Sequence, residues 1–207
     1  MTSRTTRVTC PEMDALPEQT LDDLRHFVDC EVRAGFVACA EIPDVAVEVF
    51  ADGNVAERDV RDCAVRFTAR ALAALDHEAS SWPAVTDCNR LDAAFAELEE
   101  CGVIALQNFS CCETCGHDEA LDEVQRARER GVAVVGYAFY HHQDTERAVD
   151  GGPLFLAYGG AEPGQASTVA VGKEIEAVLR SHGLRVLWDG TVEQRIHVTI
   201  DWKKRRG

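Results

Sequence analysis

Apolar residues recur at intervals near 3.6 residues through most of the first hundred positions, which is the period of a helix with one buried face. Capping residues, glycines and prolines mark where each periodic stretch begins and ends. These signals predict helices over residues 20–35, 44–50, 57–78 and 87–101. The first half of the chain is therefore expected to be entirely helical.

The pattern changes at Gly102, where short β-prone runs begin to alternate with helical stretches. Strands are predicted over residues 103–109, 132–140, 154–158, 184–188 and 195–200. Helices are predicted over residues 118–130 and 167–182, while residues 144–149 allow only a turn or two of helix.

This succession of elements predicts an α+β protein. The second half follows the order β-α-β-β-α-β with one extra strand, which is the order of the ferredoxin-like split βαβ sandwich. We therefore expect an N-terminal helical region over residues 1–101, followed by a ferredoxin-like α+β domain over residues 102–207.

The chain of 207 residues is 46% apolar, which is enough for a packed core, and its net charge is −15, most of it in the first half. A surface this negative repels phosphate backbones and anionic lipids, so we expect neither general nucleic-acid binding nor a membrane partner. The one basic cluster, residues 203–206, could contact RNA or an acidic protein partner, but a short basic terminus is more often solvated. The sequence does not indicate an oligomeric state.

No run of 18 apolar residues is present, and the first residues lack the apolar segment of a secretory signal. A cytoplasmic location is therefore expected, and the nine cysteines are expected to be thiols. Their odd number, with three of them inside five residues, argues against a disulfide framework and for a local site.

That local site is the turn of residues 111–117, which reads C-C-E-T-C-G-H and joins the first predicted strand to the next helix. Cys112 and Cys115 have the Cys-x-x-Cys spacing that lets two thiolates face one point, and His117 adds a nitrogen ligand. Zn²⁺ favours four such ligands in a tetrahedron. Because Cys111 and Cys112 are adjacent, we expect only one of them, Cys112, to bind the ion.

Two more histidines reach this place through the topology. The strands of a βαβ unit are parallel, so their carboxyl ends lie at the same edge of the sheet. The first strand ends in the cysteine turn and the second ends at His141 and His142. The predicted metal ligands are Cys112, Cys115, His117, His141 and His142, and the expected ion is zinc.

Other functions use the same atoms. A thiol-dependent enzyme or redox protein would use Cys112 and Cys115 before a helix N-terminus, whose dipole lowers a thiol pKa, although Glu113 opposes this effect. A Cys–His nucleophile pair is geometrically feasible, but nothing specifies an oxyanion hole. Alternatively, the cysteines have no reactive or metal-binding role, because free cysteine is often buried simply as a small apolar residue. These considerations favour a regulatory or interaction protein over an enzyme.

Four segments resemble a family of uncharacterised proteins common in actinomycetes, a domain of unknown function: T-D-C-N-R-L from Thr86, N-F-S-C-C-E-T-C-G over residues 108–116, Y-H-H-Q-D-T over residues 140–145, and I-D-W-K over residues 200–203. The resemblance implies an intracellular bacterial protein and no particular activity. The split βαβ order is also similar to that of regulators that inhibit ribonucleases, which suggests a protein-binding module without metal as a further alternative.

Overall fold

The computed structural model describes residues 16–206, and this part of the chain is an α+β structure of seven helices and one five-stranded mixed sheet. The helices are α1 (Glu18–Ala34), α2 (Ile42–Phe50), α3 (Glu57–Ala79), α4 (Asp87–Glu100), α5 (Glu113–Glu129), α6 (His142–Val149) and α7 (Gln165–Ser181). The strands are β1 (Val103–Leu106), β2 (Gly136–Phe139), β3 (Leu154–Gly160), β4 (Arg185–Leu187) and β5 (Ile196–Thr199). None of the helices in residues 16–206 is long and apolar enough to cross a membrane.

The chain divides into two compact units, and the boundary between them in the sequence lies between Ser80 and Ser81. In the first unit α1, α2 and α3 pack on one another through apolar faces that include Leu24, Val28 and Ala64, so the predicted helical N-terminal region is confirmed. This boundary lies earlier in the sequence than the predicted one between residues 101 and 102. The reason is that α4 packs against β1 and α7 and therefore belongs to the second unit.

The strand order of the sheet is β1-β2-β3-β5-β4. A ferredoxin-like split requires a strand between the two parallel strands, but β1 and β2 are parallel neighbours that pair directly. The ferredoxin-like arrangement is therefore not confirmed, and the analogy with ribonuclease inhibitors loses its structural basis. The antiparallel partner of β2 is β3, and their close approach depends on glycine: a Cβ on Gly136 would lie 2.4 Å from the Gly159 carbonyl oxygen.

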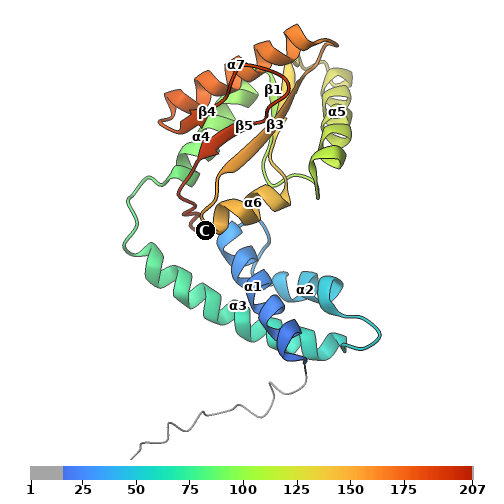
Figure 1. Cartoon of the computed structure of the whole chain (residues 1–207), viewed down its shortest axis with the longest axis vertical. Helices are drawn as coiled ribbons and strands as arrows, with labels where there is room; N and C mark the ends of the chain where they lie inside the picture. The colour runs from blue at the N-terminus through green and yellow to red at the C-terminus, as the bar shows by residue number, and fades with distance from the viewer. Residues whose placement is uncertain (1–15, 207) are drawn as a thin grey trace, which may run out of the picture. The chain divides into compact units, whose positions relative to one another are not determined.

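Helices cover the two faces of this sheet differently (Figure 1). On one face α4 packs against β1, and α7 packs against β2, β3 and β4, where Leu156 of β3 is fully buried. On the opposite face α5 covers β1, β2 and the neighbouring part of β3, where its residues join Tyr137 and Phe139 in one apolar cluster. The α5 helix thus places the cysteine turn, at its own N-terminus, beside the carboxyl ends of β1 and β2.

The basic C-terminal segment makes contacts within the second unit, so the expectation that it is simply solvated is wrong. The Lys203 backbone N–H donates to the Cys88 sulfur at 3.3 Å, and the Lys204 ammonium lies 3.0 Å from Asp92. The Arg205 guanidinium lies over the Trp82 ring at 5.7 Å and donates to backbone carbonyls beside it. These contacts offset the positive charge locally and fasten the end of the chain to α4.

Candidate metal-binding site

The cysteine turn is held by hydrogen bonds to the segment that follows β2. The Phe109 N–H donates to the Tyr140 carbonyl at 2.8 Å, and the His142 N–H donates to the Ser110 carbonyl at 3.3 Å. Ser110 has a φ of 63°, a left-handed conformation that non-glycine residues rarely adopt. The turn is therefore fixed to the start of α6, as the parallel pairing of β1 and β2 requires.

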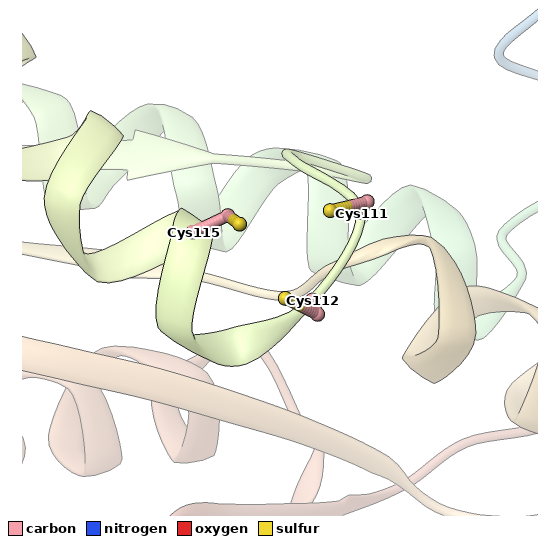
Figure 2. A group of neighbouring side chains, drawn as sticks. All are labelled: Cys111, Cys112 and Cys115. Carbon is pink, nitrogen blue, oxygen red and sulfur yellow. The ribbon is translucent and has the colours of Figure 1, made fainter.

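Three cysteines converge at the first turn of α5. Cys112 is the N-cap residue, Cys115 follows one turn later, and Cys111 precedes them. Their Sγ atoms all lie within 4.8 Å of one another, and Figure 2 shows the three sulfurs directed toward a common space. Cys111 and Cys115 are exposed and Cys112 is half-buried, so the sulfurs are accessible to a metal ion or a reagent from solution.

The thiols differ in acidity because of their positions. The Cys115 backbone N–H lowers the pKa of Cys112, with smaller contributions from the neighbouring thiols. Interactions with the Cys112 and Cys111 thiols raise the pKa of Cys115 to about 11. The cluster therefore loses its first proton most readily at Cys112.

His117 lies on the side of α5 that packs against the sheet. Its Nδ1 is 2.9 Å from the Tyr137 hydroxyl, and its ring meets the Phe139 ring edge-on at 5.2 Å. The Nε2 atom is 3.9 Å from a Glu113 carboxylate oxygen. Burial lowers the pKa of His117, which favours the neutral ring. The residue is thus engaged by the sheet and is not grouped with the cysteines.

His141 and His142 lie at the same sheet edge as the cysteine turn but face different surroundings. His142 is exposed. His141 is buried, and its Nε2 is 3.1 Å from the fully buried carboxylate of Asp144, which Arg147 and Arg195 also contact. Its Nδ1 is buried without a hydrogen-bond partner of ordinary geometry, although it faces the first turn of α6. Burial lowers the pKa of His141.

The structure thus brings together two of the predicted ligands, Cys112 and Cys115, and adds Cys111, which the sequence argument had excluded. Adjacent side chains point apart in a strand. Here the left-handed residue Ser110 turns the chain just before Cys111, and the helix begins just after Cys112. Among the described residues no histidine joins the three sulfurs within 4.8 Å.

Comparison with protein families places the chain in the family described as a domain of unknown function (DUF6891), which matches residues 17–206. The chain belongs to this family, and the match includes both compact units. No curated protein and no solved structure matches the chain. The assignment gives no activity, so a functional argument depends on the site itself.

Proposed function

We propose that this protein binds a thiophilic metal ion, with zinc as the expected ion, and that the bound site serves a regulatory or interaction role. The observation that carries the proposal is the convergence of the Cys111, Cys112 and Cys115 sulfurs within 4.8 Å on one short segment. Thiolates are soft ligands that favour Zn²⁺ and Cu⁺ over Mg²⁺ or Ca²⁺.

The cluster fits a zinc ion closely in size. Zn–S bonds of about 2.3 Å in a tetrahedron separate the sulfurs by about 3.8 Å. Side-chain rotation can supply the contraction from the present spacing, since two of the three cysteines are exposed. The positive end of the α5 dipole adjoins Cys112 and favours its thiolate form.

For the fourth position we propose His141, with His117 and His142 as weaker candidates. A metal-bound histidine usually has one ring nitrogen on a carboxylate, and His141 has this arrangement with Asp144. His117 would first have to leave the Tyr137 hydroxyl. His141 would have to approach the cysteines through a shift of the turn, because the two groups do not lie within 4.8 Å.

Metal titration of the purified, metal-stripped protein tests this function. One Zn²⁺ per chain should bind, measured by elemental analysis and by calorimetry against a chelator of known affinity. Cys112→Ser and Cys115→Ser should each abolish tight binding, whereas Cys101→Ser, at an exposed cysteine outside the cluster, should not. His141→Ala should weaken binding by about 10- to 100-fold, more than His142→Ala. A wild-type protein that binds no zinc would rule the proposal out.

The unequal thiol acidities favour a second candidate, a thiol–disulfide function of Cys112 and Cys115. A lowered pKa at the first cysteine of a Cys-x-x-Cys pair, at a helix N-terminus, is typical of redox-active thiols. Under this function oxidised glutathione would convert the pair to a disulfide, releasing two reduced glutathione molecules, and the metal-free protein would be the active form. A pair that stays reduced in an oxidising glutathione buffer would exclude this candidate.

A further inference from the structure

Part of one sheet face is not covered by α5. The α5 helix packs over β1 and β2 and reaches β3, but it makes no comparable contact with β4 or β5. Beyond it, three paired residues form a row across β3, β5 and β4: Phe155, His197 and Leu187. Phe155 and His197 are half-buried, with ring centroids 5.3 Å apart, and Leu187 is 59% exposed. We call these three residues the open row.

Two hollows lie over the open row. One, of about 400 Å³, is lined by Arg147, Phe155, Gln194 and Arg195. The other, of about 420 Å³, also contains Phe155, Gln194 and Arg195 and extends to the remainder of the open row and to Trp188. The two hollows share three lining residues, and each is within the size range of small-molecule sites.

Guanidinium groups surround this surface. Arg147 and Arg195 lie over the Phe155 ring at 5.4 and 5.7 Å, and both contact Asp144, whose single buried carboxylate faces two cations. Arg147 donates to Asp144 through one nitrogen, is 45% exposed, and has donors left for a ligand. The exposed Arg185 lies on the same face, two residues before Leu187.

Acidic side chains near the two hollows reduce the positive charge of these arginines but leave some of the Arg147 donors unused. Glu113 lies 3.7 Å from Arg195, Glu176 holds Arg180, and Asp189 lines the second hollow. The Asp189 carboxylate already accepts hydrogen bonds from Thr191. The donors that remain directed over the rings are those of Arg147, so an anionic group would bind there.

We propose that the open row and Arg147 bind a small planar ring that carries a phosphate, a compound of the nucleoside monophosphate class. The ring would stack on His197 and lie against Leu187, at the end of the open row away from the guanidinium groups that already lie over Phe155, since aromatic faces stack regardless of base identity. The phosphate would meet the guanidinium of Arg147, whose fork matches two phosphate oxygens. Gln194, at the margin of both hollows, offers an amide to the ring edge. This site contains none of the three cysteines, but Arg147 contacts the same carboxylate, Asp144, as the proposed metal ligand His141.

A single phosphate meets much less electrostatic repulsion from this protein than a nucleic-acid chain does. The net charge of −15 opposes the approach of a long polyphosphate chain, whereas one phosphate on a local guanidinium meets a far smaller repulsion. A neutral ring would lack the guanidinium contact, and inorganic phosphate would lack the stacking. The ligand class is therefore defined by the combination of the two groups.

The test is calorimetric titration of the full-length chain with adenosine monophosphate, in parallel with adenosine and with inorganic phosphate. Adenosine monophosphate should bind at least tenfold more tightly than either fragment, since each fragment loses one of the two contacts. Equal affinity for adenosine monophosphate and phosphate would overturn the role of the ring. Equal affinity for adenosine monophosphate and adenosine would overturn the role of Arg147. Absence of binding at about 1 mM would overturn the site.

Two variants locate the binding. Leu187→Glu introduces a negative charge on an exposed residue of the open row and should weaken adenosine monophosphate binding by about tenfold or more. The matched control is Leu121→Glu on α5, where the leucine is 48% exposed and lies outside both hollows. Arg147→Gln should weaken binding to a similar extent, and thermal unfolding of each variant verifies that it is folded. Equal losses in Leu187→Glu and Leu121→Glu would place the ligand elsewhere and overturn the proposal.

Discussion

At the scale of single residues, the chemistry of the site depends on how unlike its three thiols are. Cys112 caps a helix and has a lowered pKa, whereas Cys115 lies inside the first turn with a pKa of about 11. Only the thiolate is an effective nucleophile or metal ligand. Metal binding would therefore require a proton to be displaced more readily from Cys112 than from Cys115.

The first prediction concerns the rates at which these thiols react in metal-free protein. Because a lower pKa gives a larger thiolate fraction at any given pH, Cys112 should be alkylated faster than Cys115 at neutral pH. The Cys112 rate should also reach its plateau at a lower pH, while the Cys115 rate still rises at pH 9. Iodoacetamide labelling followed by peptide mass spectrometry measures both rates. Faster labelling of Cys115 at neutral pH would contradict the assignment.

The second prediction concerns Asp144, which is fully buried and contacts Arg147, Arg195 and His141. Asp144→Asn keeps the size of the side chain but leaves two guanidinium groups without their shared carboxylate. Removing one partner of a buried ion pair costs about 3–5 kcal/mol, and because both arginines are partly exposed we expect a loss near the lower end, about 3 kcal/mol. Urea unfolding measures it. Glu146→Gln, at an exposed position on the same helix, is the control and should change stability by less than about 0.5 kcal/mol.

At the scale of elements, the position of α5 determines the site. The helix begins at Glu113, five residues before the predicted start at residue 118, so Cys115 and His117 lie within it. Its first turn approaches the sheet closely because Gly116 faces the buried Phe139 ring. This close approach keeps the cysteines next to the end of β1 and directs His117 onto Tyr137.

The third prediction tests this close approach with Gly116→Ala. The new Cβ would lie 2.4 Å from Cε2 of Phe139, and that ring is itself packed against Phe109 and Tyr137. Overpacking of this kind costs about 1–3 kcal/mol, of which better helix propensity returns less than about 1 kcal/mol. We expect a net loss of about 1–2 kcal/mol in the free energy of unfolding, together with weaker zinc binding.

The control for this variant is Gly53→Ala, because a Cβ at Gly53 would meet no atom within 4 Å. Its stability and zinc affinity should match those of the wild type. If both alanine variants unfold at the same urea concentration, the contact between α5 and the sheet is not as close as the structure indicates.

At the scale of the whole molecule, charge is distributed so that the basic terminus is already occupied. The ammonium groups of Lys203 and Lys204 pair with Asp201 and Asp92, and the Arg205 guanidinium lies over the Trp82 ring, all within the second unit. These contacts link the last residues to the helix that precedes β1. The C-terminal segment therefore contributes to the packing of the second unit.

The fourth prediction follows from these contacts. A chain ending at Trp202 should be less stable than the full chain by about 2 kcal/mol, since it loses an ion pair, hydrogen bonds to backbone carbonyls and a cation–π contact. Thermal and urea unfolding measure the loss. Lys173→Gln, which removes one exposed positive charge from α7, should leave stability within about 0.5 kcal/mol of the wild type. Unchanged stability of the truncated chain would show that the segment is not fastened.

Much of the secondary structure was predictable because it depends on local spacing. The helical period and the capping residues located α1 to α4 to within a few residues, and the β-prone runs located all five strands of the described chain. The start of α5 was missed because Glu113 to His117 lack apolar periodicity, so their helical conformation depends on Gly116 packing against the sheet. The turn or two of helix predicted over residues 144–149 is α6, which begins two residues earlier because the buried Asp144 carboxylate accepts a hydrogen bond from the His141 N–H.

For the site, the sequence by itself determined the spacing of Cys112 and Cys115, because that spacing depends only on local backbone geometry. It also determined that the cysteine turn and His141 lie at the same sheet edge, because the two strands that precede them are parallel. Only the tertiary structure decided the strand order, the inclusion of Cys111, the turning of His117 toward Tyr137 and the pairing of His141 with Asp144. These outcomes depend on which distant groups compete for each side chain, and the linear spacing of residues carries no information about that competition.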